Sequence, residues 1–212
     1  MFRVNRIFRS LQGESTYAGL PCTFVRLAGC DLNCKWCDTR YARSGGVPMT
    51  MDRILEQVAA FPADMIEITG GEPLCQDETP ELCRHLLGFG ATVLVETNNH
   101  HNIDLLPEGV IRIVDVKCPG SGEQESNDWD NLARLQAGDQ VKFVVADEYD
   151  FNFVLDVVRR HRLLDKCAVL FAPVYGLCDP ASLAGWILES RMPLRLQLQL
   201  HKLIWSADRE DV

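Results

Sequence analysis

The sequence predicts an α/β fold, an incomplete (β/α) barrel of about six or seven parallel strands. Short runs rich in β-branched residues alternate with helical segments along the chain. The runs are largely apolar, which is typical of parallel strands that are buried on both faces. There are too few helices between them for a closed eight-fold barrel, so an open barrel fits the pattern better.

Seven short apolar runs are expected to form strands. They span residues 23–27, 65–69, 92–96, 111–116, 141–145, 168–171 and 194–198. Five segments between them are expected to form helices, because apolar residues recur at i, i+3 and i+4. They span residues 51–61, 78–87, 128–135, 149–163 and 180–190. Gly88 and Gly90 fit the end of one helix, and Asp179 with Pro180 fits the start of another.

Composition limits the class of protein. The chain has 212 residues, of which 47% are hydrophobic and 24% charged, so one globular domain spanning residues 1–212 is expected. A net charge of −9 and the lack of a basic run argue against nucleic-acid binding. No apolar run approaches about 18 residues, so no membrane segment is expected. Without a leader segment, the protein is expected in the cytoplasm with reduced thiols.

Three cysteines, Cys30, Cys34 and Cys37, form a C-x3-C-x2-C motif. They can hold a [4Fe–4S] cluster and leave one iron open, since such a cluster normally takes four cysteines. The open iron can bind the amino and carboxylate groups of S-adenosylmethionine. A structural zinc site with a distant fourth ligand is the alternative. The other six cysteines are expected in the core. They are Cys22, Cys75, Cys83, Cys118, Cys167 and Cys178. The adjacent His100 and His101 are not expected to share one ion.

Polar motifs follow several predicted strands at their carboxyl ends, where ligands bind in such sheets. The motifs are residues 26–39, Thr69-Gly70-Gly71-Glu72-Pro73, Glu96-Thr97-Asn98, Asp115-Val116-Lys117, and Gln197, Gln199 and His201 on the last strand. Because five strand ends converge at one edge, a single shared site is expected.

Several of these residues suit a cofactor. Gly70 and Gly71 permit close approach of the backbone, and Glu72 can meet an ammonium group; an ordinary βα turn is the alternative. Trp36 can pack against the cluster or adenine, or only against its own loop. Lys117 can hold a ribose or a carboxylate, or it can be a solvated loop lysine.

Other residues suit a polar heterocyclic substrate. Gln12 and Glu14 offer the donors and acceptors that match a heterocyclic amide edge, unless they form a surface turn. Arg26 lies in an apolar strand and requires an anion, either a substrate carboxylate or an internal one. Thr39 can give Mg²⁺ a hydroxyl ligand or cap a turn. His201 can bind substrate or serve a structural role.

These motifs resemble the radical S-adenosylmethionine superfamily and, within it, the 7-carboxy-7-deazaguanine synthase family. The cysteine motif and the Gly70-Gly71-Glu72-Pro73 turn carry the superfamily resemblance. The narrower resemblance rests on six motifs across nearly the whole chain. They are Leu11-Gln12-Gly13-Glu14, Arg26-Leu27-x-Gly29-Cys30, Trp36-Cys37-Asp38-Thr39, Glu96-Thr97-Asn98, Lys117-Cys118-Pro119-Gly120-Ser121-Gly122 and Gln197-Leu198-Gln199-Leu200-His201-Lys202.

The resemblance implies a radical-mediated ring contraction in the biosynthesis of 7-deazapurines, which feed queuosine. The substrate 6-carboxy-5,6,7,8-tetrahydropterin would become 7-carboxy-7-deazaguanine with loss of ammonia. A 5′-deoxyadenosyl radical would take a hydrogen from C6 and return it afterwards. The enzyme would be a carbon–nitrogen lyase that uses a [4Fe–4S] cluster, S-adenosylmethionine and Mg²⁺. It would be a homodimer and receive electrons from a flavodoxin or ferredoxin.

The resemblance also implies roles by position, with no catalytic residue beyond the cluster and cofactor. Cys30, Cys34 and Cys37 would hold the cluster, and Thr39 would bind Mg²⁺. The S-adenosylmethionine contacts would be Trp36, Cys37, Asp38, Gly71, Glu72, Glu96, Asp115, Val116 and Lys117. The substrate contacts would be Leu11, Gln12, Gly13, Glu14, Arg26, Thr69 and His201.

Three other functions compete with this one. An activase that generates a glycyl radical on a partner protein would share the cysteine loop but would need no pterin pocket. A non-catalytic zinc-binding scaffold would be colourless and carry zinc. An electron-transfer ferredoxin is disfavoured, because three ligands and a large barrel exceed what electron carriage needs.

Overall fold

A single nine-stranded sheet organises the part of the chain that the structure describes. In this computed structural model the described residues are 1–61, 64–207 and 209–210. The strands follow the order β3-β1-β2-β4-β5-β6-β7-β8-β9. Their bounds are β1 Phe2–Leu11, β2 Pro21–Leu27, β3 Val47–Met49, β4 Met65–Gly70, β5 Thr92–Thr97, β6 Ile111–Asp115, β7 Gln140–Val145, β8 Ala168–Pro173 and β9 Arg195–Leu196.

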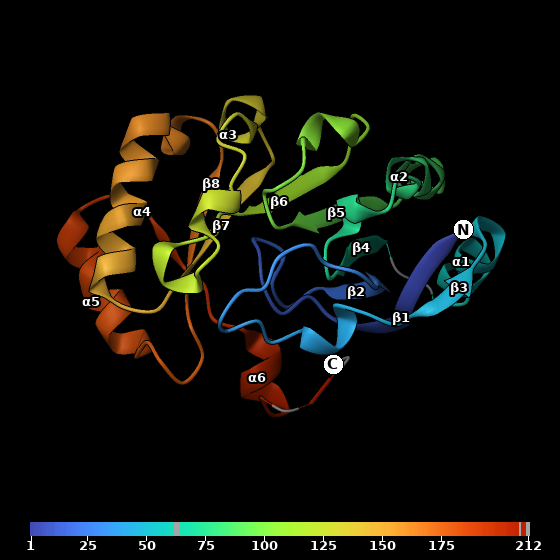
Figure 1. The fold of residues 1–212 in the computed structure, drawn as a ribbon, viewed down its shortest axis with the longest axis horizontal. Helices are drawn as coiled ribbons and strands as arrows, with labels where there is room; N and C mark the ends of the chain where they lie inside the picture. The colour runs from blue at the N-terminus through green and yellow to red at the C-terminus, as the bar shows by residue number, and fades with distance from the viewer. Residues whose placement is uncertain (62–63, 208, 211–212) are drawn as a thin grey trace.

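The longer helices cover the outer side of an open arc of strands, and the last short helix lies at its open side (Figure 1). Their bounds are α1 Met51–Ala59, α2 Thr79–Gly88, α3 Asn131–Arg134, α4 Glu148–His161, α5 Pro180–Ser190 and α6 Leu200–Ile204. Short 3₁₀ turns are η1 Arg40–Ala42, η2 Pro73–Cys75, η3 Ile103–Leu105, η4 Pro119–Ser121, η5 Gln124–Ser126 and η6 Leu163–Asp165. Asp179 caps α5 by accepting a hydrogen bond from the Ser182 amide at 3.1 Å, as the sequence predicts.

The predicted set of parallel strands is confirmed. Strands β2 and β4 to β9 form a continuous parallel series. Strands β1 and β3 were missed, and both pair antiparallel at one edge. The register of β1 shifts between Val4 and Arg6, so a bulge breaks the alternation of apolar and polar residues there. Edge strands of this kind lack the continuous apolar run that revealed the others.

Two predicted elements are shorter than expected. The strand expected at 194–198 covers only Arg195–Leu196, and the chain then turns into α6. Gln199 precedes α6 and His201 lies within it, so the expectation of a strand position for His201 was wrong. The helix expected at 128–135 spans only the four residues of α3.

The two faces of the sheet differ in chemistry. Side chains such as Val25, Ile68 and Val95 point outward, where they pack under α1 and α2, while a second cluster around Phe143 packs under α4 and α5. The inner face is apolar at the amino ends of the strands. There the rings of Phe8 and Phe24 stack with their centroids 5.1 Å apart. Polar side chains therefore collect on the inner face toward the carboxyl ends.

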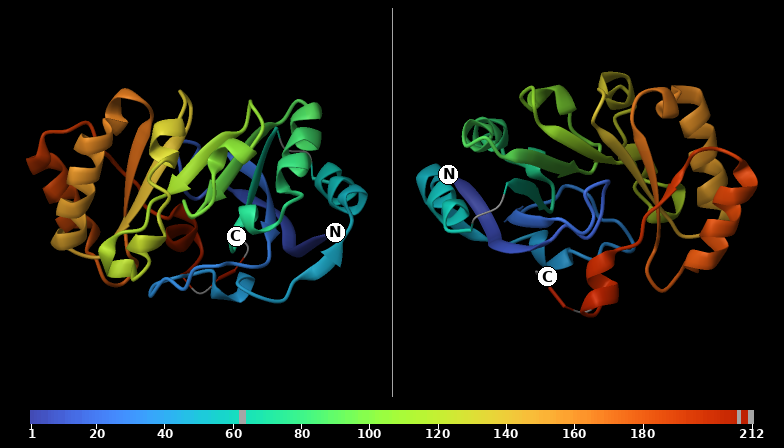
Figure 2. Two further views of the ribbon diagram at one scale, coloured as in Figure 1. Left: turned by 45° about the horizontal axis from the view of Figure 1, so that its top comes forward. Right: turned by 180° about the vertical axis from the view of Figure 1, so that it is seen from behind.

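The open side of the arc is crossed by the chain after β9. The views in Figure 2 show α6 beside the loops that follow β1 and β2. The Leu200 amide donates a hydrogen bond of 2.9 Å to the Gly13 carbonyl oxygen. This contact joins the two ends of the sheet across the gap.

Four of the six cysteines outside the motif are buried as expected: Cys22, Cys83, Cys118 and Cys178. Cys167 is half-buried, whereas the expectation was wrong for Cys75, which is exposed. Cys75 ends η2, where the chain leaves the sheet. Over the described residues, every helix is too short or too polar to span a membrane.

Candidate active site at the carboxyl ends of the strands

A cavity of about 640 Å³ opens on the inner face at the carboxyl ends of β2 and β4 to β8. It gathers almost every site residue that the sequence predicts. Those lining it are Leu11, Gln12, Gly13, Glu14, Arg26, Cys34, Trp36, Cys37, Asp38, Thr39, Thr69, Gly71, Glu96, Asp115, Val116, Lys117 and His201. Cys30 and Glu72 are not among the lining residues. The polar motifs at the ends of these strands therefore lie around one cavity, as the sequence predicts.

The cysteine loop is fixed by the Gly-Gly turn after β4. The Glu72 amide donates to the Gly29 carbonyl oxygen at 2.7 Å. A Cβ atom on Gly71 would collide with that carbonyl and would come within 2.9 Å of Cys30 Cβ. Only glycine permits this approach.

The three motif thiols are free and half-buried, and Cys34 and Cys37 face the cavity. Burial raises the pKa of Cys30 and Cys34, although Lys117 favours both thiolates. Iron would supply the remaining positive charge, because metal binding deprotonates its thiol ligands. This set of three thiols in one loop at a cavity wall fits an open-iron cluster.

Glu72 is fully buried and ties β4 to β5. Its carboxylate accepts hydrogen bonds from the Asn98 amide at 2.6 Å, the Leu74 amide at 2.9 Å and the Thr97 hydroxyl at 2.9 Å. Burial raises its pKa to about 7 despite these donors. The residue thus holds the two strand ends in register, and its predicted contact with an ammonium group stays a prediction.

Lys142 on β7 is the charged centre of the site, and the sequence analysis missed it. Its ammonium pairs with Glu14 at 2.9 Å, with Glu96, and with Asp115 at 3.6 Å. Burial opposes its charge, but these carboxylates outweigh burial and raise its pKa well above the usual value. The available signal was a lysine inside the apolar run Val141-Lys142-Phe143-Val144, at a position that faces inward.

Glu14 is held by several donors at once. Gln199 donates to Oε1 at 2.7 Å, and Gln197 donates to Oε2 at 3.1 Å. Burial would raise its pKa, but Lys142 and Gln199 together lower it. The Glu14 carboxylate is therefore ionised and points into the cavity between β7 and the segment before α6.

Glu67 on β4 is a second buried carboxylate that the sequence analysis missed. It accepts a hydrogen bond from Gln12. Burial, with repulsion from Glu96 and Glu14, raises its pKa to about 8. At neutral pH it is mainly protonated, so it adds a neutral donor and acceptor to the floor of the cavity.

Asp115 and Lys117 form a buried pair at the end of β6, with Nζ and Oδ2 3.0 Å apart. Burial opposes ionisation of Asp115, but Lys117 and Lys142 lower its pKa. Its other oxygen, Oδ1, is buried and accepts no hydrogen bond from the described residues. An unused acceptor in a cavity wall suits a ligand that donates, such as a ribose hydroxyl or an ammonium.

Asp38 and Thr39 form an oxygen-rich rim. The Thr39 hydroxyl donates to Asp38 Oδ1 at 3.1 Å, and Lys202 lies 2.8 Å from Asp38 Oδ2. Burial notwithstanding, Lys202 lowers the pKa of Asp38 far below its usual range. Thr39 precedes η1 without capping it through its side chain. Thr39 lines the cavity, and the free lone pairs of its hydroxyl fit a role as a hard-cation ligand.

Arg26 and His201 both line the cavity. The Arg26 guanidinium lies over the rings of Phe8 and Tyr41, at 5.6 and 5.8 Å from their centroids. His201 packs so closely on Gly13 that a Cβ there would overlap its ring. Burial, the largest effect, lowers the pKa of His201, so the neutral imidazole prevails.

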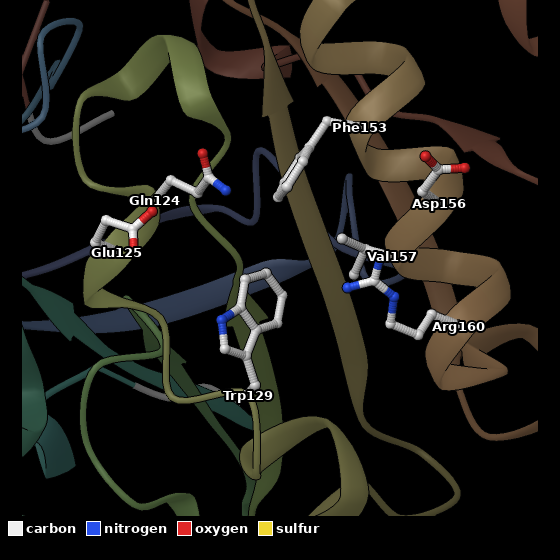
Figure 3. A pocket seen from close by; sticks show the side chains of 7 residues that line it. All are labelled: Gln124, Glu125, Trp129, Phe153, Asp156, Val157 and Arg160. Atoms are coloured by element: carbon white, nitrogen blue, oxygen red, sulfur yellow. The ribbon is translucent and has the colours of Figure 1, made fainter.

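A second cavity of about 240 Å³ lies elsewhere, between η5 and α4 (Figure 3). Trp129 and Phe153 face it, and Asp156 and Arg160 stand on the α4 side. Its walls come from the outer layer of the fold, so we assign it no part in the site at the strand ends.

Comparison with known proteins identifies the family. Residues 25–116 match the Radical SAM superfamily. A 7-carboxy-7-deazaguanine synthase of Koribacter versatilis is 41% identical over 225 residues, covering 99% of this chain and 100% of the relative. Another, of Chlorobaculum tepidum, is 43% identical and covers 99% and 96%. The chain belongs to the 7-carboxy-7-deazaguanine synthase family.

The fold agrees with this family. The crystal structure of QueE from Escherichia coli has a TM-score of 0.74 with this chain, covers 93% of both chains and is 22% identical. The chain is accordingly a radical S-adenosylmethionine enzyme, for which the donors above are suited to a [4Fe–4S] cluster and S-adenosylmethionine. The activase, zinc-scaffold and ferredoxin alternatives lose their support.

Replacing Lys142 by methionine should destabilise the protein in a pH-dependent way. Glu14, Glu96 and Asp115 would lose their shared cation, and an uncompensated buried charge costs about 3–5 kcal/mol. With Lys142 present, the lowered pKa of Glu14 contributes stability above its unfolded value of 4.5. Without Lys142 the buried carboxylates bind protons more tightly than in the unfolded chain, so stability falls as pH rises.

Urea unfolding of the parent protein and of Lys142→Met should therefore show that the substitution lowers the free energy of unfolding more at pH 8 than at pH 5. Lys35→Met, which alters an exposed lysine, is the matched control and should change the unfolding free energy little. An equal loss of unfolding free energy at both pH values would contradict the assigned ion pairs of Lys142 with Glu14, Glu96 and Asp115.

Proposed function

We propose that the chain converts 6-carboxy-5,6,7,8-tetrahydropterin to 7-carboxy-7-deazaguanine with release of ammonia, in the biosynthesis of 7-deazapurines such as the queuosine precursor. One observation carries the proposal. Two thiols of the cysteine motif, those of Cys34 and Cys37, and a set of polar groups suited to a heterocycle line one cavity, in a chain related over its full length to synthases of that product.

Cofactor binding would use the β2, β4 and β6 ends. Cys30, Cys34 and Cys37 would hold the cluster, which together with S-adenosylmethionine supplies the radical chemistry when bound. The unused Asp115 Oδ1 supports a contact with the cofactor's donors. The remaining proposed cofactor contacts line the cavity, apart from Glu72. They are Trp36, Asp38, Gly71, Glu72, Glu96, Val116 and Lys117.

Substrate binding would use the opposite wall. Glu14 is an ionised acceptor for ring N–H groups, and it can exchange its bond from Gln199 for one from the substrate. Gln12 and the protonated Glu67 offer further donors and acceptors beside it. Arg26 would pair with the substrate carboxylate. Leu11, Gly13, Thr69 and His201 would complete the pocket.

Mg²⁺ would bind at the rim formed by Thr39, next to the substrate carboxylate. A single protein hydroxyl can suffice, because Mg²⁺ keeps several waters and accepts substrate oxygens. The neighbouring Asp38 carboxylate supports the proposal by accepting a hydrogen bond from Thr39, which orients the hydroxyl. Residues 1–212 would act as one catalytic domain.

Three cellular features belong to the same proposal. A flavodoxin or ferredoxin would deliver the electron, and the protein would work in the cytoplasm. It would form a homodimer. The exposed apolar side chains of Leu203, Ile204 and Trp205 on and after α6 support burial against a second copy.

The activity test is anaerobic. Protein reconstituted with iron and sulfide, reduced and given S-adenosylmethionine, Mg²⁺ and 6-carboxytetrahydropterin should form 7-carboxy-7-deazaguanine, detected by mass spectrometry, with little net loss of S-adenosylmethionine. Cys34→Ala should abolish the product, while Cys167→Ala, which changes a thiol outside the cavity, should retain it. Release of 5′-deoxyadenosine without deazapurine would discard this substrate.

Arg26→Ala should raise KM for the carboxylated pterin. Loss of a charge-assisted hydrogen bond removes about 1.5–3 kcal/mol, which is roughly 10- to 100-fold in KM. The matched control is Arg9→Ala, an exposed arginine on the adjacent strand β1. An unaltered KM in Arg26→Ala, measured at saturating S-adenosylmethionine, would remove the carboxylate assignment.

Thr39→Ala should weaken the Mg²⁺ dependence of the rate without loss of cluster iron, because only the proposed hydroxyl ligand is removed. The Mg²⁺ concentration at half-maximal rate is the measurement. Thr39→Ser keeps a hydroxyl and should respond like the parent protein. If Thr39→Ala and the parent need the same Mg²⁺ concentration, this ligand assignment fails.

A further inference from the structure

Outside the cavity, three side chains from separate segments meet beside the cysteine loop. Asp31 lies in that loop, Cys75 ends η2, and His101 follows β5. One ligand atom from each lies within 4.8 Å of the others. We propose that Asp31, Cys75 and His101 bind a divalent transition-metal ion, Zn²⁺ or Fe²⁺, in a site separate from the three-cysteine cluster.

Two of the ligand–ligand distances lie close to those around a tetrahedral ion, and the third is within 4.8 Å. His101 Nε2 lies 3.5 Å from Cys75 Sγ and 2.9 Å from Asp31 Oδ2. Zinc bonds of about 2.3 Å to sulfur and about 2.0–2.1 Å to nitrogen or oxygen place tetrahedral ligand atoms roughly 3.3–3.6 Å apart. The sulfur–nitrogen separation already fits, and the nitrogen–oxygen separation would have to increase by about a few tenths of an ångström.

The chemistry of the donors selects the ion. A thiolate and an imidazole favour zinc or ferrous iron, whereas Mg²⁺ and Ca²⁺ prefer all-oxygen sites. Two of the three side chains are partly open to solvent, with exposed side-chain fractions of 28% for Asp31 and 31% for His101. Cys75 is exposed as well. Water can therefore occupy the fourth position.

Neighbouring side chains hold the Asp31 carboxylate and the backbone of His101. Asn98 Nδ2 donates to Asp31 Oδ1 at 3.0 Å, which leaves Oδ2 facing His101. Asn131 Nδ2 donates to the His101 carbonyl oxygen at 2.8 Å. Such outer contacts are typical of metal sites, where they fix the orientation of the ligands.

The adjacent His100 and His101 lie side by side and make different contacts. The His100 and His101 rings stack at 5.3 Å, and His100 Nδ1 lies 3.2 Å from Asp31 Oδ2. Both rings thus reach the same carboxylate, although only His101 joins the three-ligand group. His100 would support Asp31 from outside the ion.

The site has a structural consequence for the cysteine loop. Asp31 directly follows Cys30, and Asn98 Nδ2 reaches both Asp31 and, at 3.9 Å, Cys30 Sγ. An ion held by Asp31, Cys75 and His101 would clamp the cysteine loop to the segments after β4 and β5. The clamp would hold the loop whether or not the cluster is assembled.

Metal content of the tag-free, cluster-reconstituted enzyme tests the proposal. After dialysis against excess Zn²⁺ and then metal-free buffer, the parent protein should keep one zinc per chain beyond its four cluster irons. Cys75→Ser and His101→Ala should lower the zinc affinity at least about ten-fold. His85→Ala, an exposed histidine on α2, is the matched control and should keep the zinc. A fifth iron that disappears in Cys75→Ser would support the site with Fe²⁺.

Alkylation of Cys75 separates this site from the cluster thiols. Peptide mapping after iodoacetamide treatment should show that Zn²⁺ slows modification of Cys75 at least about ten-fold in the parent protein and not in His101→Ala. The proposal would be overturned if the parent protein retained no ion beyond the cluster, or if Cys75→Ser retained as much zinc as the parent protein. It would also be overturned if Cys75 were alkylated at the same rate with and without Zn²⁺. The residues would then form only a hydrogen-bonded His–Asp pair beside a free thiol.

Discussion

The buried ammonium of Lys142 is the interaction on which the inner face of the sheet depends. It lies within β7, beside the ends of β5 and β6, and pairs with Glu96, Asp115 and Glu14. Buried carboxylates repel one another and lose hydration, so they remain ionised only beside a cation. Lys142 allows the ends of β5 and β6 and the β1–β2 connection each to place an acidic side chain in one cavity. The outer face needs no buried cation, because it is apolar and covered by helices.

The balance of charge around Lys142 is incomplete, and this affects what the cavity can bind. Lys142 and Lys117 face Glu14, Glu96 and Asp115, and Glu67 stays mainly protonated because a further charge would be uncompensated. The walls are thus rich in acceptors, which suits ligands with many N–H groups or a positive charge. The proposed pterin has several N–H groups, and S-adenosylmethionine has a positively charged sulfonium. The guanidinium of Arg26 supplies the separate positive charge that a substrate carboxylate needs.

The sequence predicted the parallel sheet and the convergence of motifs well, because both follow from local patterns. Apolar runs reveal buried strands, and glycine pairs such as Gly70 and Gly71 reveal close approaches. The bulged strand β1 escaped because its alternation is interrupted. Lys142 and Glu67 escaped for a different reason: a charged residue within an apolar strand becomes meaningful only when its partners on other strands are known. No local pattern joins Asp31, Cys75 and His101, whose proximity arises from the fold.

The last constraint concerns closure of the open barrel. Seven parallel strands leave a gap, and the segment from Gln197 to Lys202 fills it with polar side chains instead of another strand. Gln199 and Gln197 bond to Glu14, while Lys202 pairs with Asp38 in the cysteine loop. The same short segment therefore touches both proposed halves of the site, the substrate wall and the cofactor wall. A strand continued through this place would direct Gln197 and Gln199 to one face and Lys202 to the other, because its side chains alternate between two faces. The turn into α6 instead brings Lys202 to Asp38, which also accepts a hydrogen bond from Gln199.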